Sequence, residues 1–383
     1  MHVEPFRINV AQRTLDDLRE RLARARFPSV VRGAGWAYGS DLATMRDLVD
    51  YWLDGYDWRA QEAMLNERMP QFLGDVDGRL IHFVHARAED PAALTLVMTH
   101  GWPGSFVEFY KVIEPLTHPE RHGGNAVDAF HVLCPSMTGY GWSDPWLEPG
   151  CDVRLVAERQ VKLLDGLGIE RYGVQGGDWG GIVSPYMAML APDKVIGLHL
   201  NMCSTPSTDD PEEARVQGVM PGRTCISREY YREQKGYAVI QSLMPDQLAY
   251  ALNDSPLGLA AWVVQCFYLW GDLADGDLGS RFSRDELLTN IMVYWVTESM
   301  PAAIRLYRES LRAGTFGPPQ GYVATPTAVA LFKDIPRPKR AWAEQVYDVR
   351  RWTEMPSGGH FAALEEPVRL VEDIRAFFAG LRR

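Results

Sequence analysis

Short apolar runs alternate with longer amphipathic stretches along most of the chain. Apolar or alternating runs of strand length occupy residues 80–85, 94–98, 130–133, 171–175, 195–200, 327–332 and 349–354. Apolar positions at helical spacing, or apolar runs of helix length, occupy residues 14–26, 41–53, 153–167, 182–190 and 368–378. Strands that alternate with helices are typical of a mostly parallel sheet covered by helices. The pattern therefore predicts an α/β fold built on a mostly parallel, doubly wound sheet.

Two segments depart from this alternation. Residues 74–78 read Gly-Asp-Val-Asp-Gly, a composition typical of a turn, ahead of the strand at 80–85. From about residue 206 to residue 315 the pattern becomes helical and rich in aromatic residues, without runs that would fit parallel strands. We predict that this second segment is a helical insertion in the sheet domain.

The first candidate chemistry lies between the strand at 171–175 and the helix at 182–190. Residues 176–181 read Gly-Gly-Asp-Trp-Gly-Gly, so Asp178 is the central residue of a Gly-x-Asp-x-Gly frame. The same frame with serine is the nucleophile elbow of α/β-hydrolases, a strained strand-to-helix turn that exposes a reactive side chain. A carboxylate at this place attacks carbon by displacement and leaves an ester on the enzyme. The expected substrate is then an alkyl electrophile such as an epoxide or a halide.

An acid and a base follow Asp178 in the order that α/β-hydrolases use. Asp334 comes just after the apolar run at 327–332, and His360 lies in a Pro/Gly-rich loop after the last predicted strand. Doubly wound sheets place their ligands beyond the carboxyl ends of the strands, so we expect these three side chains to meet there. Asp334 alone would also fit a solvated Lys-Asp pair at a strand end.

Charge and cysteine usage narrow the class of protein. A net charge of -11 argues against nucleic acid or an anionic membrane as a partner. The five cysteines are widely scattered, without a CxxC pair or a Cys/His cluster, so we expect neither a disulfide framework nor a metal site. No signal-peptide core is visible, and no window approaches about 18 uninterrupted apolar residues. We therefore expect a cytoplasmic protein with reduced cysteines.

Three motifs resemble those of the microsomal-type epoxide hydrolases, and the similarity covers nearly the whole chain. Residues 100–105 (His-Gly-Trp-Pro-Gly-Ser) match the oxyanion motif of that family, residues 176–180 match its nucleophile motif, and residues 358–361 (Gly-Gly-His-Phe) match its base motif. The amino-terminal segment, with Pro-Phe-Arg-Ile at residues 5–8, looks like the family's wrapping extension. The resemblance implies an α/β-hydrolase fold with a helical cap and this N-terminal extension. The implied division is 1–92 for the extension, 93–205 and 316–383 for the two parts of the core, and 206–315 for the cap.

The resemblance also implies a two-step reaction that gives a vicinal diol. Asp178 opens the epoxide and becomes a covalent ester, and His360, oriented by Asp334, activates the water that hydrolyses this ester. Tyr237 and Tyr307 occupy the positions of the two cap tyrosines that hold the epoxide oxygen in the family.

The oxyanion motif implies two further details. The backbone N–H groups of Trp102 and Trp179 are expected to stabilise the tetrahedral oxyanion of the second step. Pro103 is expected to follow a cis peptide bond. The implied reaction requires a small-molecule epoxide and water, and neither a metal ion nor an organic cofactor.

The mammalian microsomal members carry an amino-terminal membrane anchor, and we expect none in this protein. It therefore looks like a soluble bacterial or fungal member, for which a homodimer is one expected assembly. Bacterial relatives include enzymes of antibiotic biosynthesis, although no residue identifies a particular substrate.

Two other functions remain compatible with parts of the pattern. A haloalkane dehalogenase shares the fold and an Asp-Trp-Gly elbow but lacks the tyrosine pair, so Tyr237 and Tyr307 discriminate against it. A non-catalytic binding protein of the hydrolase fold would not need the complete set of nucleophile, acid and base.

Overall fold

The computed structural model describes residues 1–205, 236–334 and 337–382. Its centre is a nine-stranded sheet with the order β1-β2-β3-β5-β4-β6-β7-β8-β9. The strands are β1 (Val3–Phe6), β2 (Gln71–Val76), β3 (Arg79–Ala86), β4 (Leu94–Thr99), β5 (Phe130–Pro135), β6 (Tyr172–Gly176), β7 (Val195–Leu200), β8 (Val323–Leu331) and β9 (Tyr347–Glu354). In this order, the pairs β1–β2, β2–β3 and β3–β5 are antiparallel, and all pairs from β5 to β9 are parallel. The predicted mostly parallel α/β sheet is thus confirmed.

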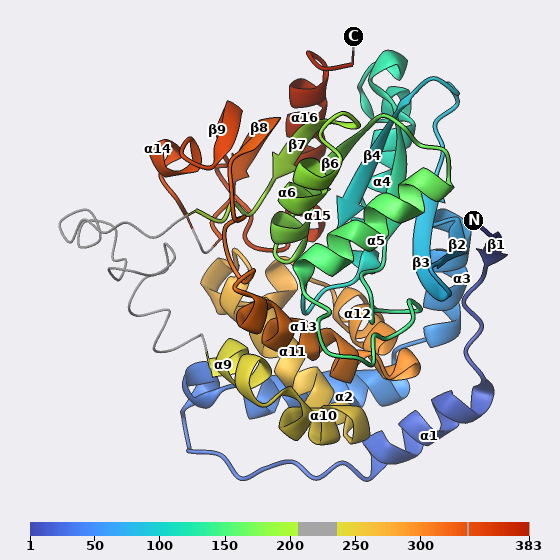
Figure 1. The fold of residues 1–383 in the computed structure, drawn as a ribbon. Coiled ribbons are helices and arrows are strands. Elements are labelled where there is room, and N and C mark those ends of the chain that lie inside the picture. The colour runs from blue at the N-terminus through green and yellow to red at the C-terminus, as the bar shows by residue number, and fades with distance from the viewer. Residues whose placement is uncertain (206–235, 335–336, 383) are drawn as a thin grey trace.

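Helices cover the sheet and extend below its carboxyl edge (Figure 1). In the first part of the chain they are α1 (Gln12–Ala23), α2 (Leu42–Asp54), α3 (Trp58–Arg68), α4 (Ile113–Thr117), α5 (Val153–Gly166) and α6 (Gly180–Leu190). After residue 235 they are α9 (Gly236–Leu243), α10 (Pro245–Asp254), α11 (Pro256–Trp270), α12 (Arg284–Thr297), α13 (Met300–Ala313), α14 (Arg340–Ala343), α15 (Ala362–Glu365) and α16 (Pro367–Phe378).

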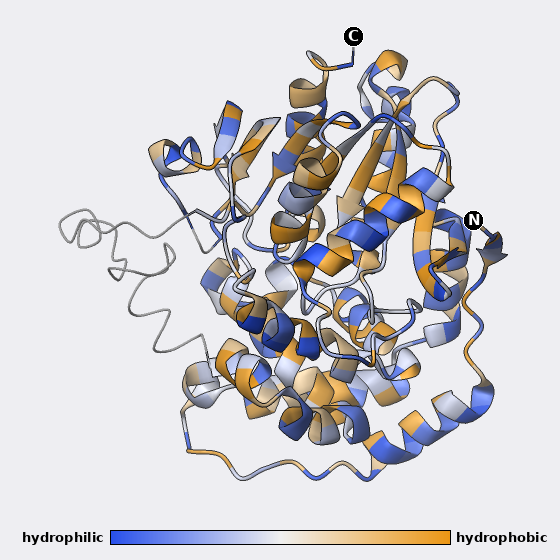
Figure 2. Cartoon of the chain, in the orientation of Figure 1, coloured by the Kyte–Doolittle hydropathy of each residue, from blue (hydrophilic) through white to orange (hydrophobic). Residues whose placement is uncertain are grey.

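The burial of each element explains its sequence pattern. Every residue of β4 is buried, and this is why its sequence is continuously apolar or nearly so and does not alternate. Helix α5 is buried along one stripe and is capped by Asp152, whose side chain accepts a hydrogen bond from the Leu155 N–H. Figure 2 shows the result as apolar central strands beside the two-coloured α5.

The helices between β7 and β8 form a separate layer beneath the sheet (Figure 1). Helices α9 to α13 make up the described part of the predicted insertion, and residues 206–235 lie outside the described residues. The amino-terminal helices wrap around this layer. The Tyr56 hydroxyl lies 3.0 Å from the Thr289 hydroxyl, and the Tyr51 hydroxyl donates to Asp285 over 2.7 Å.

The prediction of a turn at residues 74–78 is wrong for the first three of these residues. Residues 74–76 belong to β2, where Gly74 pairs with both Val3 and Ile81. Only Asp77 and Gly78 form the turn, and both have positive φ angles, 54° and 76°. Glycine and aspartate are uncommon in strands, so Gly74 and Asp75 do not suggest one. The pairing partner β1 is also too short and too distant in sequence to be recognised.

Within the described residues, no helix combines the length and apolar character required to cross a bilayer.

Candidate active site

Asp178 lies in a sharp turn between β6 and α6, as the glycine frame predicts. Its φ of 49° is in the left-handed region, which is uncommon for a residue with a side chain and marks a strained turn. A Cβ atom at Gly180 would lie 1.9 Å from the carbonyl oxygen of Thr99, at the end of β4. Glycine is required there because the elbow packs directly against the neighbouring strand.

The loop after β4 holds the Asp178 carboxylate. The Trp102 N–H donates to Oδ1 of Asp178 over 2.7 Å, and the Trp102–Pro103 bond is cis, as expected. A Cβ atom at Gly101 would lie 2.3 Å from Oδ1, so only glycine permits this approach. One carboxylate oxygen is therefore fixed against the predicted oxyanion donor, and the other, Oδ2, points toward His360.

His360 lies between the two aspartates. Its Nδ1 is 2.9 Å from Oδ1 of Asp334, and its Nε2 is 3.4 Å from Oδ2 of Asp178. The side chains of His360 and Asp334 are 8% and 5% exposed, so their interaction is largely screened from water. The structure thus brings together the three residues that the sequence places after β6, β8 and β9.

The charge balance at His360 favours the imidazolium. Burial alone would lower the pKa of His360, but the negative charges and hydrogen bonds of Asp334 and Asp178 outweigh it and hold this pKa well above its usual value. Converting Asp178 to a neutral ester would remove one of these two charges. The pKa of His360 would then fall, and more of the imidazole would be neutral and able to accept a proton.

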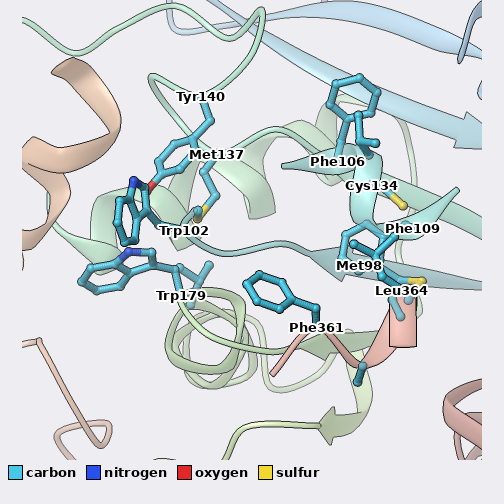
Figure 3. Packing of buried hydrophobic residues seen from close by; sticks show 14 of the residues in the cluster. Met98, Trp102, Phe106, Phe109, Cys134, Met137, Tyr140, Trp179, Phe361 and Leu364 are labelled. Atoms are coloured by element: carbon cyan, nitrogen blue, oxygen red, sulfur yellow. The ribbon is translucent and has the colours of Figure 1, made fainter. Parts of the chain in front are cut away.

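The two predicted cap tyrosines lie over the elbow. The Tyr237 ring stacks on Trp102 with a centroid separation of 5.3 Å, and the Tyr307 ring meets Trp179 edge-on at 4.6 Å. The two tyrosine rings are themselves 6.0 Å apart. Burial raises the pKa of Tyr307 well above its usual value, and Asp178 adds to this effect, so its phenol stays protonated. Figure 3 shows Trp102 and Trp179 within the apolar cluster that surrounds this place.

Three residues at the site have no clear signal in the sequence. Trp270, at the end of α11, lies 5.0 Å from both the His360 ring and the Tyr237 ring, although one aromatic residue among many in the cap attracts no attention. Glu108 lies beside the loop that holds Trp102, and burial raises the pKa of its carboxyl to about 8. Glu365 accepts hydrogen bonds from the amides on both sides of His360. Neither glutamate belongs to a sequence pattern that predicts such contacts.

Comparison with known proteins gives matches over the whole chain. The family model described as "Epoxide hydrolase N terminus" matches residues 3–109, and the one described as "alpha/beta hydrolase fold" matches residues 95–222. Juvenile hormone epoxide hydrolase 1 of Ctenocephalides felis is 36% identical over 97% of this chain and 84% of its own length. Epoxide hydrolase 1 of Sus scrofa is 35% identical over 100% of this chain and 89% of its own length.

A solved structure extends this similarity to the whole fold. The crystal structure of juvenile hormone epoxide hydrolase from the silkworm Bombyx mori superposes with a TM-score of 0.86 at 30% identity, and the match covers 100% of this chain and 94% of the silkworm chain. The same fold therefore accompanies the sequence similarity from the wrapping extension to the last helix. The chain belongs to the epoxide hydrolase family, within the α/β-hydrolase fold.

Proposed function

We propose that this epoxide hydrolase converts its substrate to a vicinal diol through a covalent ester on Asp178. The observation that carries the proposal is that both carboxylate oxygens of Asp178 have a defined partner. The Trp102 N–H holds Oδ1 at 2.7 Å, while Oδ2 faces His360 at 3.4 Å, and the tyrosine pair packs on Trp102 and Trp179 beside this carboxylate. Such an arrangement suits attack by Oδ2 on an epoxide carbon held under the tyrosines.

In the first step, Oδ2 of Asp178 forms a bond to one ring carbon and the bond from that carbon to the ring oxygen breaks. The oxygen becomes an alkoxide, to which Tyr237 and Tyr307 donate hydrogen bonds. One of these phenols passes its proton to the alkoxide and regains a proton from solvent. Donors aimed at a charge that develops in the transition state lower the barrier more than donors to the ground state do. The product of this step is a hydroxyalkyl ester on Asp178.

In the second step, water attacks the ester carbonyl carbon of Asp178. His360 accepts the water proton at Nε2, and Asp334 stabilises the imidazolium through Nδ1. Oδ1, already bound to the Trp102 N–H, carries the negative charge of the tetrahedral intermediate, and the Trp179 N–H is the second proposed donor. When the intermediate collapses, the bond from the carboxyl carbon of Asp178 to the alkyl oxygen breaks and His360 returns its proton to that oxygen, so the diol departs and the carboxylate is restored.

The proposed function is tested by two substrates in parallel. We expect hydrolysis of styrene oxide to its diol, without release of bromide from a bromoalkane, because the tyrosine pair donates to an epoxide oxygen and a bromide leaving group makes no use of such donors. Bromide release without diol formation would indicate a haloalkane dehalogenase. Neither reaction, in a folded protein, would favour a non-catalytic binding protein.

Asp334→Asn tests the assignment of the acid. We expect it to slow ester hydrolysis on the order of 10²-fold, because the imidazole loses the charge that stabilises its protonated form, and to change alkylation much less. Removal of this charge also lowers the pKa of His360, so the acid limb of the hydrolysis step should move to lower pH. Stopped-flow tryptophan fluorescence separates the steps, as Trp179 adjoins Asp178. Equal slowing of both steps would assign the acid role to another residue.

Several narrower expectations stay predictions. They are the cytoplasmic location, the homodimer and a role in antibiotic biosynthesis. The division into an extension (1–92), two core parts (93–205 and 316–383) and a cap (206–315) is likewise part of this proposal. In it, the cap supplies the tyrosines and the core supplies the nucleophile, acid and base.

A further inference from the structure

The loop that carries His360 is attached to the cap as well as to the sheet domain. Four consecutive backbone N–H groups, those of residues 358–361, each donate a hydrogen bond. Gly358 donates to Oδ2 of Asp272 over 2.9 Å, and His360 donates to the carbonyl oxygen of Trp270 over 2.9 Å. Trp270 is the last residue of α11, and Asp272 lies two residues beyond it. The base loop is thus in direct contact with cap residues through its backbone.

Glu365 accepts the other two of these hydrogen bonds. The Gly359 N–H donates to its Oε2 and the Phe361 N–H to its Oε1, each over 2.9 Å. The Asp272 N–H adds a third hydrogen bond, to Oε2, over 2.7 Å. Glu365 is 8% exposed, and burial raises the pKa of its carboxyl, whereas these three N–H donors and the nearby His360 oppose that rise and favour the ionised carboxylate. A single buried carboxylate therefore connects the residues on both sides of His360 with the end of α11.

The cap side of this contact is itself fixed by charge. The Asp272 carboxylate forms ion pairs with the Lys333 ammonium at 3.0 Å and with the Arg281 guanidinium at 3.3 Å. Lys333 immediately precedes Asp334, and its backbone N–H donates to the Gly358 carbonyl over 2.8 Å. The acid, the base loop and the end of α11 are consequently joined in one network.

We propose that Glu365 is a positioning residue for His360. Glu365 holds the imidazole between Asp334 and Asp178 and connects the base loop to the cap through Asp272. This inference rests on the proposed function, in which His360 is the base of the second step. A base must lie within hydrogen-bond reach of the water that it deprotonates, and a displacement of about 1 Å costs roughly 10²-fold in rate. Glu365 touches neither substrate nor water in this role and acts through the backbone of residues 359 and 361.

Glu365 also affects His360 electrostatically. The positive charge of His360 opposes the rise that burial produces in the pKa of Glu365. The interaction is reciprocal, so the anionic Glu365 raises the pKa of His360. Ester hydrolysis needs neutral His360, and its rate falls when the pH drops below this pKa. Loss of the Glu365 charge should therefore move the acid limb of the hydrolysis step to lower pH.

Glu365→Gln is the test variant. Glutamine has the same length, but one of its two terminal atoms is an NH₂ group, which would face a backbone N–H where an oxygen now accepts. We expect ester hydrolysis to slow roughly 10- to 100-fold, with its acid limb at lower pH and alkylation changed far less. The two rates are measured in single turnovers with styrene oxide, by tryptophan fluorescence and by rapid quench.

Asp373→Asn is a matched control, since it also removes the charge of a buried carboxylate in the same part of the chain. Asp373 lies in α16 and binds His199 at 3.0 Å, together with Arg351 and Thr353. We expect this variant to unfold at a lower temperature but to keep the wild-type ratio of hydrolysis to alkylation and the wild-type acid limb. A change in Glu365→Gln that Asp373→Asn does not share is then specific to the base loop.

Glu365→Asp keeps the proposal testable if the glutamine variant does not fold. Aspartate retains the charge but is one methylene shorter, so we expect slower hydrolysis with an unmoved acid limb. The inference is overturned if a folded Glu365 variant hydrolyses the ester at the wild-type rate, or if Asp373→Asn changes the ratio of the two steps equally. Failure of the wild-type protein to form any ester would instead contradict the proposed function itself.

Discussion

Replacing His360 with glutamine should give a protein that opens one epoxide molecule and then stops. In the proposed mechanism, attack by Asp178 does not use the imidazole as a base, whereas hydrolysis of the ester does. Glutamine cannot accept the water proton, so we expect hydrolysis to slow on the order of 10⁴-fold or more. Intact-protein mass spectrometry should show one added substrate mass, and peptide mapping should place it on Asp178.

The control for this experiment is the double variant Asp178→Ala, His360→Gln, which should acquire no mass. The assignment would be wrong if the adduct mapped to another residue. It would also be wrong if the His360→Gln protein formed no adduct with an epoxide that the wild-type protein hydrolyses.

The tyrosine pair should produce the second large effect, confined to the alkylation step. An epoxide carbon is attacked slowly unless the departing oxygen is stabilised. If Tyr237 and Tyr307 both donate to that oxygen, either change to phenylalanine should slow alkylation by about 10²- to 10³-fold, as for the loss of one oxyanion donor. The double change should nearly abolish alkylation, and the two losses need not add, because both phenols serve one atom. Ester hydrolysis should change little, since it uses His360 and backbone amides.

Tyr56→Phe is the matched control for these variants. Tyr56 is a half-buried tyrosine whose hydroxyl is hydrogen-bonded to Thr289 on the side of the amino-terminal helices. We expect this variant to alkylate at the wild-type rate. Circular dichroism must show that each variant is folded. Wild-type rates in both folded single variants, Tyr237→Phe and Tyr307→Phe, would mean that these tyrosines are packing residues of the cap.

The meeting of Asp178, Asp334 and His360 could be predicted because each of them has local sequence context. Asp178 lies between glycines that only a tight elbow requires, and His360 lies after two glycines in a loop that follows a strand. Asp334 has weaker local context, and it was predicted as the acid mainly because it lies between Asp178 and His360 in the chain order of α/β-hydrolases. Parallel strands bring their carboxyl ends to one edge, so residues far apart in sequence meet there. The distances of 2.9 Å and 3.4 Å from His360 to the two aspartates agree with this expectation.

Other parts of the site depend on contacts that no linear pattern records. Among 16 tyrosines, Tyr237 and Tyr307 were identified only through the family resemblance. Glu365 was missed because its role comes from three backbone amides at residues 272, 359 and 361, which meet only in the folded chain. The β1–β2 pairing was missed for the same reason, since Val3 and Gly74 become neighbours only when the extension wraps around the domain.

The central claim is that the oxygen added to the epoxide comes first from Asp178 and not from water. The most direct measurement is a single turnover of excess wild-type enzyme with styrene oxide in ¹⁸O-labelled water, followed by mass spectrometry of the diol and of the peptide that contains Asp178. A covalent ester predicts an unlabelled diol from this first turnover and ¹⁸O in the Asp178 carboxylate. A labelled diol and an unlabelled peptide would show direct attack by water and would contradict the account.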